Sequence, residues 1–91
     1  MKHDSEKSRV DLIPAKSLLE VGKVLGYGSK KYGENNWQSL DNGIKRYKAA
    51  ALRHLLQADF EDKDSETGLS HYTHACANLL FIIHLLEQGN D

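Results

Sequence analysis

The stretch that decides the fold is SHYTHACANLLFIIHLLEQ, residues 70–88. Its apolar residues recur at helical spacing, and Gly89 and Asn90 follow as a stop signal. This pattern predicts a helix that begins just after Ser70 and continues to about Gln88. One apolar stripe of that helix holds five side chains: Tyr72, Cys76, Leu79, Ile83 and Leu86.

Further apolar residues flank this stripe, so the helix is apolar around most of its circumference. A surface helix needs an apolar stripe of only about 100°, and a small domain buries a limited fraction of its surface. We therefore expect a homo-oligomer in which the surplus apolar surface lies in a subunit interface. Cys76, among apolar positions, is interpreted as a small core residue.

A first helix is predicted from Asp11 or Leu12, with Pro14 in its first turn, where the missing N–H does no harm. Gly33 is its predicted stop. Residues 34–39 are expected to form a loop that carries Trp37, the one tryptophan of the chain.

A second helix is predicted from about Gly43 to Phe60, capped by Asp41 or Asn42, with three consecutive alanines in its middle. Residues 59–68 form an acidic connector to the last helix. No segment alternates with period two for long enough to be a strand. The sequence predicts an all-α fold, a compact bundle of three main helices per chain completed by oligomerisation.

Length and composition limit the class of protein. Ninety-one residues make one domain at most, which we place at residues 11–89 after a flexible N-terminal tail at 1–10. With 12 basic and 13 acidic residues the formal charge is −1, so stable nucleic-acid binding is not expected. The single cysteine excludes an internal disulfide and any multi-cysteine zinc site. No signal or membrane segment is visible, which favours a cytoplasmic protein without membrane partners.

Two imidazoles lie one turn apart near the start of the last predicted helix. His71, His74 and Asn78 are spaced i, i+3 and i+7, so they share one helix face. Such a face can hold a metal or bind a phosphate at the helix N-terminus. The alternative interpretation is a partly buried polar stripe in which each histidine hydrogen-bonds a backbone carbonyl.

Acidic side chains precede these histidines by a few residues in the connector. Carboxylates are the ligands that Mg²⁺ prefers, and Mn²⁺ accepts histidine as well. A calcium-binding EF-hand loop is excluded, because its sixth position must be glycine. That position is Asp64 if the loop starts at Asp59, and Thr67 if it starts at Asp62. A solvated, charged turn is the alternative to a metal site. The acids concerned are Glu61, Asp64 and their neighbours Asp62 and Glu66.

Basic and aromatic residues gather at the end of the first helix and on the second. Lysine and arginine beside aromatic rings suit a nucleotide, because cations bind phosphates and rings stack on bases. The glycines here do not have the spacing of a P-loop, and aromatic packing with solvated lysines is the alternative. The group comprises Tyr27, Lys30, Lys31, Tyr32, Trp37, Arg46, Arg53 and His54.

Five segments, taken in order, carry a family resemblance: DLIP (11–14), LGYGSKKYG (25–33), NW (36–37), RHLL (53–56) and ETGLSHYTHA (66–75). As a set they resemble the phage-associated dATP/dGTP diphosphohydrolase N-terminal domain family of small α-helical proteins. The resemblance implies a nucleoside triphosphate ligand. If a phage encodes the chain, we expect the protein in the host cytoplasm. In active members it implies metal-assisted release of pyrophosphate, with Mg²⁺ or Mn²⁺ polarising the phosphates.

All-α nucleotide pyrophosphatases generally display carboxylate pairs one turn apart on facing helices. Here the corresponding stretch reads HACAN, residues 74–78, where such enzymes would show acids. Two functions therefore stay open. One is a metal-dependent diphosphohydrolase acting on purine (deoxy)nucleoside triphosphates. The other is a nucleotide sponge without a metal, which sequesters a linear or cyclic nucleotide signal of a host defence system.

The candidate residues divide by role. The expected catalytic residues are His54 and Glu61. The expected metal ligands, if a metal binds, are Glu61, Asp64, His71 and His74. The expected nucleotide contacts are Tyr27, Lys30, Lys31, Tyr32, Trp37, Arg46, Arg53 and Asn78.

Overall fold

The computed structural model describes residues 7–89, with α1 at Ala15–Tyr32, α2 at Gly43–Gln57 and α3 at His71–Glu87. Two short 3-10 helices flank α1, η2 at Val10–Leu12 and η3 at Asn36–Ser39. Within residues 7–89, β pairing is limited to one isolated bridge between Lys63 and Ser70. The predicted all-α fold with three main helices is confirmed.

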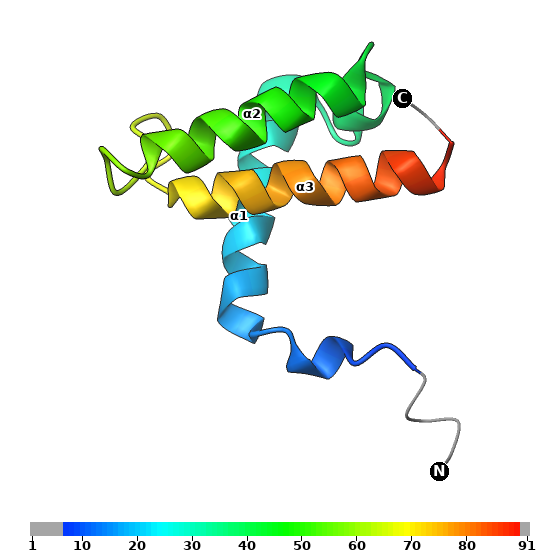
Figure 1. Ribbon diagram of the computed structural model, residues 1–91, viewed down its shortest axis with the longest axis horizontal. Coiled ribbons are helices and arrows are strands. Elements are labelled where there is room, and N and C mark those ends of the chain that lie inside the picture. Colours follow the sequence, from blue (N-terminus) through cyan, green and yellow to red (C-terminus); the bar gives the residue numbers. More distant parts are fainter. Residues whose placement is uncertain (1–6, 90–91) are drawn as a thin grey trace.

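Helices α2 and α3 lie side by side and antiparallel, and α1 runs across the pair (Figure 1). The connector between α2 and α3 closes one end of the antiparallel pair. The first turns of α1 and the preceding η2 stand away from the other helices (Figure 1). Of the predicted N-terminal tail, residues 1–6 lie outside the described part of the chain.

Two predicted helix boundaries are confirmed by their caps. Gly33 has φ +96°, which suits glycine, and its N–H donates to the Ser29 carbonyl to close α1. Ser70 precedes α3, and its hydroxyl oxygen accepts a hydrogen bond from the Tyr72 N–H. A Ser side chain at this position satisfies a backbone donor that the first helical turn leaves free.

Two other boundaries differ from the prediction. Helix α1 begins at Ala15, because Ile13 before the proline is extended at φ −75° and ψ 125°. Helix α2 ends at Gln57, three residues before the expected Phe60. The Gln57 carbonyl there accepts both the Phe60 and Glu61 N–H groups in a turn. Phe60 is 89% exposed, so no apolar contact favours a longer helix.

The buried core is small and rich in alanine. Small side chains let the backbones of α2 and α3 approach closely, and Leu85 adds the largest aliphatic side chain. The buried apolar residues among those described are Val21, Ala51, Ala75, Ala77 and Leu85.

The apolar stripe predicted on the last helix faces outward in this chain. Tyr72, Leu79, Ile83 and Leu86 are all exposed, because α3 turns Ala75, Ala77 and Leu85 toward the interior instead. The interpretation of Cys76 as a core residue is wrong, since its side chain is exposed on the same surface. Oligomerisation through this surface stays a prediction.

No helix among residues 7–89 has the length and apolarity that crossing a bilayer requires.

Candidate functional site

A pocket of about 750 Å³ lies between α1, η3, α2, α3 and the connector. Its size falls within the range of roughly 300–1,000 Å³ that small-molecule sites occupy. The cationic and aromatic candidates that line it are Tyr27, Lys31, Tyr32, Trp37, Arg46 and Arg53. The polar candidates His54, Asp64, His74 and Asn78 line it as well. Segments far apart in the sequence thus meet around one space, as the binding hypothesis requires.

Three candidates lie outside the lining of this pocket. Lys30 borders a shallower surface depression together with Lys23 and Leu69. Glu61 is on the connector and half-exposed, and His71 is buried behind the pocket wall. The two expected catalytic residues, His54 and Glu61, do not lie on one helix, because α2 ends between them.

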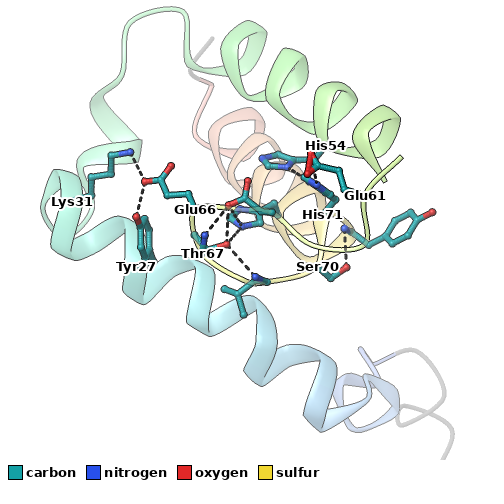
Figure 2. Close-up of polar contacts among 12 residues, drawn as sticks. Tyr27, Lys31, His54, Glu61, Glu66, Thr67, Ser70 and His71 are labelled. Carbon is teal, nitrogen blue, oxygen red and sulfur yellow. Dashed lines mark hydrogen bonds and ion pairs between the residues drawn. The ribbon is translucent and has the colours of Figure 1, made fainter. Parts of the chain in front are cut away.

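Two imidazoles meet where the end of α2 lies beside the start of α3. The Nδ1 atoms of His54 and His71 are 3.0 Å apart. On its other side, the Nε2 atom of His71 lies 3.6 Å from Glu61 Oε1, too far for a hydrogen bond (Figure 2). His71 is 1% exposed, and its Nε2 has no hydrogen-bond partner among residues 7–89. A buried imidazole nitrogen without a hydrogen-bond partner destabilises the fold unless another group binds to it.

The connector supplies a carboxylate to the same region. Asp64 Oδ2 accepts hydrogen bonds from the Thr67 N–H and hydroxyl, both at 3.0 Å. The Thr67 hydroxyl also lies 2.7 Å from His74 Nε2, which is itself 3.7 Å from Asp64 Oδ2. The ring of His74 stacks on that of His54, with centroids 4.6 Å apart. Three imidazoles and one carboxylate therefore form a connected group, here called the histidine cluster: His54, Asp64, His71 and His74.

Burial changes the charge state of this cluster. It lowers the pKa of His54 below its ordinary value of 6.5, and the neighbouring His74 and His71 lower that pKa further. Burial also lowers the pKa of His74, although Asp64 opposes the change. Burial raises the pKa of Asp64, but the hydrogen bonds from Thr67, together with the nearby His74 and His54, lower it more, so the pKa falls below the ordinary 3.8. Near neutral pH, His54 and His74 are neutral and Asp64 is ionised.

These shifts predict how the stability of the metal-free protein depends on pH. Above 6.5, His54 and His74 are neutral in both the folded and the unfolded chain. As the pH falls through 6.5 the unfolded chain takes up protons first, so the free energy of unfolding decreases. We expect the thermal unfolding midpoint, measured with a chelator present, to be lower at about pH 5.5 than at about pH 7.5. A double His54→Gln and His74→Gln variant should show a smaller difference, and an equal difference would contradict this explanation.

Glu66 ties the connector to α1. Its Oε2 atom accepts hydrogen bonds from the Tyr27 hydroxyl at 2.6 Å and from Lys31 Nζ at 2.8 Å (Figure 2). The contact with Lys31, followed by that with Tyr27, lowers the pKa of Glu66. All three groups are exposed, so this ion pair contributes little to stability. Its effect is positional, since it holds Lys31 at the pocket wall.

Aromatic side chains form the opposite end of the pocket. Trp37 stacks on Phe81 with ring centroids 4.4 Å apart, and His84 contacts it edge-on at 5.2 Å. The Tyr47 hydroxyl donates to the Trp37 carbonyl at 2.7 Å. Trp37 therefore helps to anchor η3 on α2 and α3, besides lining the pocket. Tyr32, another expected nucleotide contact, is 63% exposed.

Sequence reasoning gave no role to Thr67 and placed Glu66 only among the acids of the connector, yet both residues organise the site. Thr67 joins Asp64 to His74, and Glu66 joins Tyr27 to Lys31. A signal for Thr67 exists in the Asp64–Thr67 spacing, because an Asp side chain often accepts the N–H of a residue shortly after it in a turn. Asn78 also has a local role, donating from Nδ2 to the His74 carbonyl at 2.9 Å.

Comparison with known proteins places these observations in a family context. The family described as "dATP/dGTP diphosphohydrolase, N-terminal" matches residues 1–91. A dATP/dGTP diphosphohydrolase of Salmonella phage PMBT28 is 42% identical over 88 residues, which make up 96% of this chain and 30% of that relative. The chain thus spans about a third of the length of this relative. No solved structure matches the chain.

Proposed function

We propose a function from one premise: the chain belongs to the family of dATP/dGTP diphosphohydrolase N-terminal domains. The proposal is that the pocket binds a purine (deoxy)nucleoside triphosphate and takes part in its hydrolysis to a monophosphate and pyrophosphate. The observation that carries it is the joint lining of one pocket by cationic side chains, aromatic rings and three members of the histidine cluster, His54, Asp64 and His74.

The arrangement of the pocket suggests an orientation for the nucleotide. Arg46 and Arg53 are seven residues apart on α2, so their backbones lie about 10 Å apart along one helix face. That spacing lets them contact different parts of a triphosphate. Arg53 adjoins His54, whereas Trp37 and Tyr47 lie at the aromatic end. We place the phosphates toward Arg53 and the histidine cluster, and the base toward Trp37 and Tyr32.

The proposed reaction needs little covalent chemistry from the protein. The oxygen of a water molecule attacks the α-phosphorus, the bond from that phosphorus to the bridging oxygen breaks, and pyrophosphate leaves. A proton of the water passes to solvent. Arginine and lysine side chains neutralise the charge that develops on the phosphate oxygens. A bound divalent metal would polarise the phosphates and lower the pKa of the attacking water. His54 and Asp64 line the pocket at the end where this step is proposed.

A second candidate function is nucleotide binding without hydrolysis. The observation that favours it is that two of the three acidic residues lining the pocket already accept hydrogen bonds: Glu66 from Tyr27 and Lys31, and Asp64 from Thr67 at its Oδ2 atom. A protein of this kind would sequester a linear or cyclic nucleotide. It would bind without metal and release its ligand intact.

One experiment separates the two functions. The purified protein is incubated with dATP, dGTP, the pyrimidine triphosphates and cyclic nucleotides, with and without Mn²⁺. It is then denatured, and the released compounds are separated by chromatography. We expect dATP and dGTP to give monophosphate and pyrophosphate in the presence of metal.

The controls define the alternatives. A ligand removed from solution but recovered intact on denaturation would replace the hydrolase by the sequestering function. Failure of every nucleotide to bind, under conditions where the protein is folded, would contradict both functions.

A further inference from the structure

The histidine cluster brings together potential metal ligands from three segments of the chain. His54 is on α2 and His71 is on α3 (Figure 2). Asp64 is on the connector between these helices. One ligand atom from each of these three residues lies within 4.8 Å of the others. His54 and Asp64 are partly buried and His71 is fully buried.

The contact between His54 and His71 favours a shared ion. Two imidazole nitrogens on one tetrahedral zinc lie about 3.3 Å apart, given Zn–N bonds of roughly 2.0–2.1 Å. The two Nδ1 atoms are 3.0 Å apart, so a few tenths of an ångström of movement would accommodate the ion.

The unpartnered nitrogen of His71 points to the same conclusion. With an ion on its Nδ1 atom, the proton of the neutral ring is on Nε2, where Glu61 Oε1 lies 3.6 Å away. A histidine ligand usually donates its other N–H to a carboxylate, carbonyl or water, which fixes the ring and strengthens the bond to the metal. A small movement of the half-exposed Glu61 would complete that hydrogen bond. It would also satisfy the one buried side-chain nitrogen that lacks a partner within residues 7–89.

We infer that His54, Asp64 and His71 bind a divalent transition metal of the zinc class, with Glu61 as a positioning residue behind His71. Two imidazoles and one carboxylate form a ligand set used by catalytic zinc and related metals, and such sites leave a coordination position open. Mg²⁺ fits this set poorly, because it prefers oxygen ligands in an octahedron.

His74 has a supporting role in this assignment. Its Nε2 atom is engaged by the Thr67 hydroxyl, and its ring packs on His54. Thr67 in turn holds Asp64. His74 therefore orients the ligand His54, and Thr67 orients the ligand Asp64. The use of the ion in hydrolysis rests on the proposed function, but its binding can be measured without any nucleotide.

The test uses metal alone. The whole chain is stripped with a chelator and titrated with Zn²⁺ by calorimetry, and with Co²⁺ by visible absorption, which reports the coordination of the ion. We expect one ion per chain, and no displacement of Zn²⁺ by excess Mg²⁺. Asp64→Asn and His54→Gln should each abolish tight binding while circular dichroism shows unchanged helix content. Asp62→Asn, on the same exposed connector, and His84→Gln, on α3 at the aromatic end, are matched controls that should bind as wild type does.

Glu61→Gln tests the positioning role. Replacing the hydrogen-bond partner of a metal-binding histidine typically weakens metal affinity about 10- to 100-fold, so the variant should bind more weakly but with the same stoichiometry and Co²⁺ spectrum. A folded wild-type chain that takes up no Zn²⁺ or Co²⁺ would overturn the inference, as would Asp64→Asn and His54→Gln variants that bind as tightly as wild type. Nucleotide binding that persists in a chain without metal affinity would overturn the metal site alone and leave the pocket assignment standing.

Discussion

Replacing Arg53 by alanine is expected to weaken nucleotide binding about 10- to 150-fold. Charge-assisted hydrogen bonds contribute roughly 1.5–3 kcal/mol each, and 1.4 kcal/mol corresponds to a tenfold change in affinity. Arg53 lines the pocket next to the histidine cluster, where we place the phosphates. Its fork of N–H donors can bind two phosphate oxygens at once. The measurement is calorimetric titration of dATP or dGTP into the wild type and the variant.

Two further variants give this prediction its control. Lys48 is an exposed cation on the same helix and is absent from the pocket lining, so Lys48→Ala should leave the affinity unchanged. Arg53→Lys keeps the charge but loses the fork, and its affinity should fall between those of wild type and Arg53→Ala. If Arg53→Ala binds as tightly as the wild type, Arg53 is not part of the site. Equal losses in the Lys48 and Arg53 variants would indicate a general charge effect.

Helix boundaries could be predicted where one residue determines the backbone. Gly33 ends α1 because its positive φ suits glycine, and Ser70 starts α3 because its hydroxyl satisfies a free N–H. The end of α2 could not be predicted, since residues 58–60 contain neither Gly nor Pro. The turn there depends on the Gln57 carbonyl accepting two N–H groups and on the absence of apolar contacts for Phe60. The absence of apolar contacts for Phe60 depends on tertiary packing, which the local sequence does not specify.

The same distinction between local sequence and tertiary packing applies to the candidate site. Helical spacing places His71 and His74 on one face without any knowledge of the fold. The approach of His54 to His71 depends on the antiparallel pairing of α2 and α3, which periodicity does not specify. The bond between Glu66 and Lys31 spans 35 residues and depends on how α1 crosses the pair. Residue types therefore indicated the chemistry, whereas packing determined which groups meet.

Replacing Leu85 by alanine is expected to cost about 2–5 kcal/mol of unfolding free energy, the usual range for a buried leucine truncated in a core. Leu85 is 3% exposed and is the largest of the buried aliphatic side chains. The other buried residues of α3 are His71 and two alanines, so few neighbours can fill the space that the truncation leaves. Urea unfolding followed by circular dichroism measures the change. A loss below about 1 kcal/mol would mean that the site collapses around the smaller side chain.

The adjacent Leu86 makes this experiment a test of oligomerisation as well. Leu86 is 62% exposed and belongs to the apolar surface with Leu79 and Ile83. In a monomer, Leu86→Ala should change the unfolding free energy by no more than about 0.5 kcal/mol. If copies of the chain associate through this surface, the loss should be larger and should depend on protein concentration, because association stabilises the folded chain by mass action. The Leu85 variant should show its cost at every concentration. A small, concentration-independent effect of Leu86→Ala would therefore argue against burial of Leu86 in a subunit interface.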